Sequence, residues 1–178
     1  MFSDIAIDTA VAVGSILSGK GRAYWARLDE VEEVVEDEKV TSSAGCYRRA
    51  FIFDNFVVKV SKTKDRTKEL KAEADFINKM KADPKFGRHF PDTLCIEVSG
   101  VCVQVQEKVD MNHRKPGRGG WQIEDAVENL ATKLGISDCH IGNYGWKGPK
   151  GKEYPVFIDV DFRLSQSSSK SKKRSWMV

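Results

Sequence analysis

The chain has 178 residues, enough to bury a core in one domain or in two small lobes, so it needs neither disulfides nor a structural metal to fold. Lys and Arg number 29 against 26 Asp and Glu, so the bulk charge does not favour nucleic acid or a membrane as the main partner. The four cysteines form no C-x-x-C pair, and no early stretch joins a basic region to an uninterrupted apolar segment, which predicts a reducing, cytoplasmic location.

Two helices are expected at the start of the chain. The first lies in the apolar run 5–17, which Asp4 and Asp8 interrupt and which is too short to span a bilayer, so we interpret it as amphipathic. The second lies in the acidic run 29–39, whose valines recur at helical spacing; a solvated helix face explains this charge better than a binding decoy. We therefore expect 1–38 to form an N-terminal helical segment.

A hairpin follows the helices. Residues 47–53 alternate between polar and apolar, Asp54 and Asn55 make the turn, and the apolar run 56–60 forms the second strand, with Lys59 inside it. An ammonium group in such a strand needs either an exposed face or an anionic partner, because burying an unpaired charge is costly. Either account fits Lys59 taken alone.

The next helix, expected over 67–81, contains a carboxylate in its apolar stripe. Glu73 lies three residues after Leu70 and four before Ile77, and both of these belong to the stripe. Packed on the sheet, this helix would point Glu73 toward Lys59 and form a charge-assisted pair within about 4 Å. The alternative is a chance carboxylate at the edge of the stripe.

The rest of the chain predicts two more hairpins, a linker and a helix. They are a hairpin over 94–109 with a Ser99-Gly100 turn, a linker over 111–120, a helix with its apolar stripe from Ile123 to Leu134 ending at Gly135, and a third hairpin over 144–159. The linker is a candidate boundary between two lobes.

The sharpest chemical signal lies between the last helix and the last strand. Asp138 and Asn143 stand five residues apart on a predicted loop, and Asp159 follows sixteen residues later, near the end of a strand. Phosphoryl transfer needs a lysine on the nucleotide phosphates, a carboxylate to accept the proton of the attacking hydroxyl, and carboxylate and amide oxygens for Mg²⁺. The residue types and their order supply all of these groups.

At these residues the sequence resembles the protein-kinase-like superfamily. FVVK, ending at Lys59, stands in place of the strand-three V-A-I-K motif, and Glu73 stands at the position of the helix-C glutamate. The D-x-x-x-x-N pattern matches the catalytic loop, and Asp159 matches the Mg²⁺-binding aspartate. The variant D-x-H-x-G-N, with I-D-x-D in place of D-F-G, is similar to the small early protein kinases of bacteriophages and to aminoglycoside and choline phosphotransferases. The resemblance runs from about residue 45 to residue 162.

The resemblance implies an α+β, two-lobed protein-kinase-like fold with an antiparallel sheet and a helix C in the N-lobe and a strongly truncated C-lobe. The implied organisation is the helical segment 1–38, an N-lobe over 39–109, a minimal C-lobe with the catalytic loop over 110–164, and a disordered Ser/Lys-rich tail over 165–178.

It also implies an ATP-dependent phosphotransferase of the Ser/Thr protein kinase type that uses Mg²⁺ and, if phage-encoded, acts on host proteins in the host cytoplasm. The implied roles are Asp138 as catalytic base, Lys59 on the phosphates and held by Glu73, Val57 over the adenine ring, Glu107 and Val109 in the hinge that meets the base, and Asn143 and Asp159 as metal ligands.

The sequence departs from the family pattern at three places. The predicted loop 41–46, which would cover the phosphates, has one glycine where many kinases have G-x-G-x-x-G. Ile136 replaces the first residue of the H-R-D signature, and Val160-Asp161 replaces Phe-Gly after the metal-binding aspartate. His140 is expected to orient its neighbours rather than to bind zinc, since no Cys/His spacing resembles a zinc site.

Two alternatives stay open. The first is a catalytically degenerate kinase-like module that inhibits or sequesters a host protein, which the few residues after Phe162 favour. The second is nucleic-acid contact through the basic residues Arg114, Lys115, Arg118 and the basic tail, although no aromatic stacking platform accompanies those charges. No membrane partner is expected.

Overall fold

The structure is a computed structural model that describes residues 2–36, 40–45, 47–111, 125–136 and 138–160. Its contacts divide the chain into two compact units, one of Met1–Gly87 with Pro91–Lys108 and one of Arg88–Phe90 with Val109–Val178. The described residues contain four α-helices, a five-stranded antiparallel sheet and a two-stranded antiparallel sheet. The α+β class predicted from the sequence is therefore confirmed.

The first unit is built on the five-stranded sheet, in the order β1-β2-β3-β5-β4. Its strands are β1 (Thr41–Ala44), β2 (Arg48–Ile52), β3 (Phe56–Ser61), β4 (Thr93–Val98) and β5 (Val101–Glu107). Both hairpins predicted for this region are confirmed, and Ser99 and Gly100 make the second turn with φ of 47° and 79°. The segment 41–46 was predicted as a loop, but residues 41–44 form an edge strand that pairs with β2.

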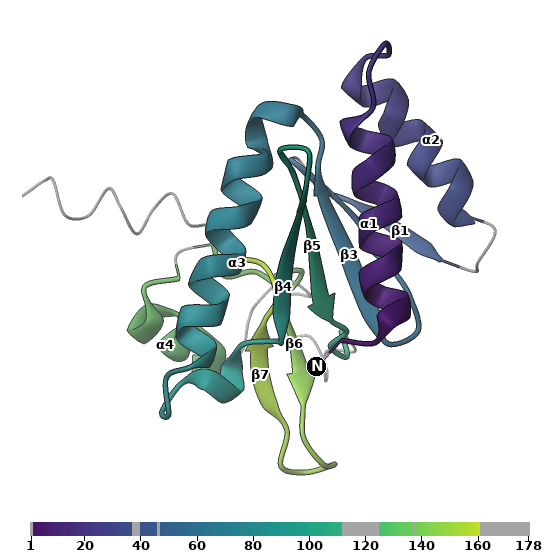
Figure 1. The fold of residues 1–178 in the computed structure, drawn as a ribbon. Coiled ribbons are helices and arrows are strands. Elements are labelled where there is room, and N and C mark those ends of the chain that lie inside the picture. The colour runs from purple at the N-terminus through teal and green to yellow at the C-terminus, as the bar shows by residue number, and fades with distance from the viewer. Residues whose placement is uncertain (1, 37–39, 46, 112–124, 137, 161–178) are drawn as a thin grey trace, which may run out of the picture. The chain divides into compact units, whose positions relative to one another are not determined.

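Helices α1 (Asp4–Ser18) and α2 (Tyr24–Glu36) belong to the same unit as the five-stranded sheet. Figure 1 shows both helices on one side of the sheet, where α1 contacts β4 and β5. One apolar cluster joins the two helices to β5 and β3 through Val101, Val103 and Val105 of β5 and Phe56, Val58 and Val60 of β3. A Cβ on Gly14 of α1 would lie 2.7 Å from a Val98 methyl group, so glycine permits the close approach of this helix to β4.

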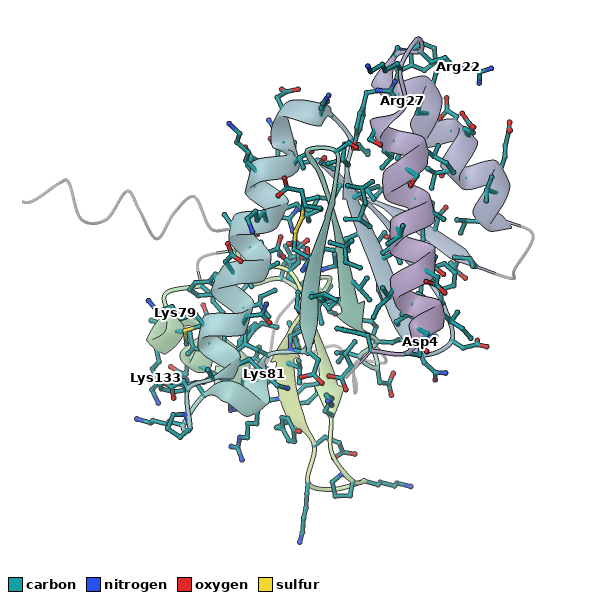
Figure 2. The ribbon with its side chains drawn as sticks, in the orientation of Figure 1. Asp4, Arg22, Arg27, Lys79, Lys81 and Lys133 are labelled. Atoms are coloured by element: carbon teal, nitrogen blue, oxygen red, sulfur yellow. A yellow bond between two sulfur atoms is a disulfide. The ribbon has the colours of Figure 1, made fainter. Side chains whose placement is uncertain are left out.

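Helix α3 (Thr67–Lys81) follows the short 3₁₀ turn Lys64–Arg66 and covers the other side of the sheet (Figure 1). Its bounds are those expected from the apolar spacing. The residues of α3 that are buried are Thr67, Leu70, Glu73, Ala74 and Ile77. The opposite side of the helix is exposed and carries lysines, of which Lys79 is labelled in Figure 2.

The second unit contains α4 (Asp125–Leu134), β6 (Tyr144–Lys147) and β7 (Tyr154–Phe157). The boundary between the units falls within the 3₁₀ turn Gly87–His89, after Gly87. Strands β6 and β7 form the third predicted hairpin, and the ring of the buried His89 is held by a 2.8 Å hydrogen bond between Nδ1 and the carbonyl of Pro155. Gly135 ends α4 with φ of 72°, as expected of a helix C-cap. Ile123, the linker beyond residue 111 and the tail over 165–178 lie outside the described residues.

Within the described parts of the chain, no helix combines the length and the apolar character needed to cross a bilayer.

Candidate functional site

The sheet side under α3 carries polar side chains, whereas the side under α1 and α2 is apolar. Side chains alternate along a strand, so the even-numbered residues of β5 and the odd-numbered residues of β3 share the side that faces α3. We call this side of the sheet the polar face. Its buried polar side chains are Lys59, Ser61, Thr93, Gln104 and Gln106. Because burying polar groups is unfavourable unless they are paired, such a concentration makes this side of the sheet a candidate functional surface.

Lys59 lies at the centre of the polar face. It pairs in register with Ala50 on β2 and with Gln104 on β5, and only 6% of the residue is exposed. The structure thus excludes the simplest alternative, a lysine on an exposed side of the strand. Val57 lies two residues earlier on the same face and is half-buried.

Glu73 projects from α3 onto this face and is 1% exposed, which confirms that the carboxylate lies inside the buried stripe of its helix. Its carboxylate forms an ion pair with the Nη1 atom of Arg48, the first residue of β2. The sequence had predicted Lys59 as the partner; that pair stays a prediction, and Arg48 was missed. Removing one partner of such a buried pair typically costs about 3–5 kcal/mol.

Strand alternation could have revealed Arg48. Arg48 pairs with Ser61 and lies two residues before Ala50, the partner of Lys59, so the guanidinium and the ammonium belong to one side of the sheet. The next residue, Arg49, points to the opposite side and pairs with Glu32 of α2 at 2.6 Å. The register of β2 therefore assigns one arginine to each face.

Gln104 is the second residue that the sequence did not single out. It is fully buried, and neither its amide nitrogen nor its amide oxygen has a hydrogen-bond partner among the described residues. Its neighbour on the strand, Gln106, by contrast donates to the Thr93 hydroxyl at 3.5 Å. A buried amide without partners costs about 1–3 kcal/mol, which makes Gln104 a group that a ligand or water could satisfy.

The polar face also carries a disulfide between Cys95 of β4 and Cys102 of β5, drawn as a yellow bond in Figure 2. Cys95 pairs with Gln104 and Cys102 with Glu97, so the two cysteines are diagonal neighbours in the ladder. The spacing of the cysteines along the sequence does not predict this pairing, because it depends on the strand register. The reducing compartment inferred from the sequence stays a prediction.

Two backbone N–H groups of the predicted hinge already donate hydrogen bonds within the first unit. The Glu107 amide donates to the Asp92 carbonyl at 2.9 Å, and the Lys108 amide donates to the Asn55 carbonyl at 3.4 Å. Glu107 pairs with Phe56, so its side chain lies on the side opposite Lys59. Val109 is 5% exposed. A bound base would therefore have to meet backbone groups other than these two N–H groups.

In the second unit, Asn143 forms hydrogen bonds to backbone groups of both Asp138 and Asp159. The Asn143 side-chain amide donates to the Asp138 carbonyl at 2.8 Å, and the Asn143 carbonyl accepts from the amides of Ile158 at 2.9 Å and Asp159 at 3.3 Å. Asn143 is 6% exposed, so this network fixes the orientation of its amide group. The amide oxygen is the atom of that group suited to a hard cation.

The Asp138 side chain is about half exposed (52%), and its Oδ1 lies 3.9 Å from the Nε2 of His140. The Nδ1 atom of His140 accepts a hydrogen bond from the Gly142 backbone N–H at 3.1 Å, which fits the orienting role expected of His140. Burial, with the carboxylates of Glu128 and Asp138 adding to it, raises the pKa of the Cys139 thiol to about 11. The thiol therefore stays protonated at neutral pH and is a poor nucleophile.

The two residues predicted to hold Mg²⁺, Asn143 and Asp159, are too few to enclose a metal ion without further ligands. Among the described residues, no group of three or more His, Cys, Asp or Glu side chains could hold a metal ion. Mg²⁺ usually takes one or two protein oxygens and completes its shell with phosphates and water. A carboxylate on Asp159 and an amide oxygen on Asn143 meet that requirement.

The eight predicted site residues thus divide between the two units. The first unit holds Val57, Lys59 and Glu73 on the polar face and Glu107 on the other side of the sheet, and the second unit holds Val109, Asp138, Asn143 and Asp159. No protein-family model, curated protein or solved structure matches the chain.

Proposed function

We propose that this chain is an ATP-dependent phosphotransferase of protein-kinase-like design that transfers phosphate to Ser or Thr hydroxyls of a protein. The observation that carries the proposal is Lys59 buried on the third strand of the antiparallel sheet, on the face onto which the next helix projects a buried glutamate. In kinases the phosphate-binding lysine lies on the third strand and works with a glutamate of helix C. The helix C assigned here is α3.

The proposal gives the first unit the role of the N-lobe and the second the role of a shortened C-lobe. Lys59 contacts the nucleotide phosphates, Val57 packs on the adenine ring, and the backbone near Val109 meets the base. Asn143 and Asp159 hold Mg²⁺, which when bound neutralises charge on the phosphates. Asn143 is already oriented by its bond to the Asp138 carbonyl.

Asp138 acts as the general base. The acceptor hydroxyl oxygen forms a bond to the γ-phosphorus, the bond from that phosphorus to the β–γ bridging oxygen breaks, and ADP leaves. The hydroxyl proton passes to the Asp138 carboxylate, whose exposure allows an acceptor to approach it.

A degenerate binding module is the second candidate, and one observation favours it. The Glu73 carboxylate forms an ion pair with Arg48, a partner that the kinase resemblance does not assign to this glutamate. A module of this kind would inhibit or sequester a host protein without transferring phosphate. It predicts no turnover even where nucleotide is bound.

The nucleotide-binding step is tested by thermal unfolding. MgATP at about 100 times its Kd should add about 2.7 kcal/mol to the free energy of unfolding, which raises Tm by about 5–10 °C for a chain of this size. ATP with a metal chelator should give a smaller shift, and Mg²⁺ alone should give none. A Tm that does not move at millimolar MgATP would contradict the phosphotransferase and leave the degenerate binding module as the remaining candidate.

A further inference from the structure

Arg48 occupies a position from which it can reach the same ligand as Lys59. It is the first residue of β2 and follows the turn after β1, the region that the kinase resemblance assigns to covering the phosphates. Its side chain lies on the polar face, because Arg48 pairs with Ser61 and Lys59 is two residues before Ser61 on β3. Two cations of neighbouring strands therefore share one side of the sheet.

The ion pair with Glu73 orients Arg48 without enclosing it. The side chain of Arg48 is 26% exposed, whereas that of Glu73 is 1% exposed. The guanidinium thus extends from a buried carboxylate toward solvent. A guanidinium carries five N–H donors in a rigid plane, so it can bind a carboxylate on one edge and a phosphate on another. A lysine at this position could not bridge two anions in the same way, because its charge is a single point on a flexible stem.

We propose that Arg48 is a second phosphate-binding cation of the nucleotide site, held in position by the Glu73 carboxylate. The inference rests on the proposed function, because it assigns Arg48 to the ligand that Lys59 would bind. It goes beyond the resemblance, whose phosphate contacts come from the lysine, the metal and the loop backbone. The side chain at the start of β2 adds a charged contact to the phosphates and none to the nucleoside.

The test compares the affinity for MgATP with the affinity for adenosine, which lacks the triphosphate. Arg48→Met alone would leave Glu73 buried without this partner and could unfold the protein, so the substitution is made in a Glu73→Gln background, in which neither partner is left as an unpaired buried charge. Calorimetry then measures the Kd of MgATP and of adenosine for the wild type, for Glu73→Gln and for the double variant. The matched control is Arg49→Met, since Arg49 is similarly buried but points to the opposite side of the sheet.

Relative to Glu73→Gln, the double variant should lose about tenfold or more in MgATP affinity while its adenosine affinity stays the same, because a charge-assisted hydrogen bond to phosphate is absent. Arg49→Met should leave the ratio of the two affinities at the wild-type value. Equal losses for MgATP and adenosine, or no loss for either, would overturn the role of Arg48 while leaving the proposed function in place. A wild type that binds no MgATP would overturn both.

Discussion

Replacing Asp138 with asparagine should lower phosphoryl transfer about 10²–10⁴-fold while leaving MgATP affinity unchanged. The amide keeps the size of the side chain but cannot accept the proton of the attacking hydroxyl. The hydrogen bond that orders this loop is made by the Asp138 backbone carbonyl, so the Asn143 amide should keep its position in the variant. Because half of the side chain is exposed, we expect little change in stability.

Transfer is measured as the incorporation of label from γ-labelled ATP into the proteins of a bacterial lysate, alongside calorimetric titration of MgATP. The matched control is His140→Asn, which removes an orienting neighbour without removing the base and should slow transfer less than Asp138→Asn does. Equal loss of ATP affinity and transfer in the Asp138 variant would contradict the division of roles. If Asp138→Asn transferred phosphate at the wild-type rate, Asp138 would be excluded as the base.

Asp159→Asn should abolish the dependence of nucleotide binding on Mg²⁺. Loss of a group that only supports a metal ligand lowers metal affinity about 10–100-fold, so loss of the ligand itself should lower it about 100-fold or more. The backbone amide of Asp159 still donates to Asn143 in this variant, which preserves the local structure. The Kd of ATP should then be the same with Mg²⁺ and with a chelator.

Glu153→Gln is the control for Asp159→Asn, because Glu153 is another carboxylate of the same hairpin whose side chain accepts from the Gly151 amide at 2.7 Å. It should keep the wild-type Mg²⁺ dependence. If the Asp159 variant keeps that dependence too, the metal site proposed for this strand is wrong.

Local patterns predicted most of the elements. Helix α3 was expected over 67–81 and is found there, because its apolar spacing and its burial against the sheet agree. The hairpin turns were expected from Gly, Asn and Ser, whose backbone preferences are local. Strand β1 was missed because residues 41–43 are exposed and do not alternate; their strand exists because β2 offers them an edge. Such pairing with a sheet edge cannot be predicted from residues 41–44 alone.

The same limit explains what was predicted of the candidate site and what was not. The burial of Glu73 follows from the helical period alone, and it was predicted correctly. The Arg48 partner and the Cys95–Cys102 pair depend on which residues face each other across strands, and a one-residue change in register would move them to the other side. The catalytic and nucleotide-binding roles stay predictions, because they concern ligands rather than packing.

The central claim is that Lys59, on the polar face, binds the phosphates of MgATP, and calorimetric titration of the wild type and of Lys59→Met tests it most directly. We predict one-site binding of MgATP by the wild type, weakened about tenfold or more in the variant because an ammonium–phosphate contact is lost. Adenosine affinity should be the same in both proteins. The claim is contradicted if the wild type gives no binding heat at millimolar MgATP, or if Lys59→Met binds MgATP as tightly as the wild type does.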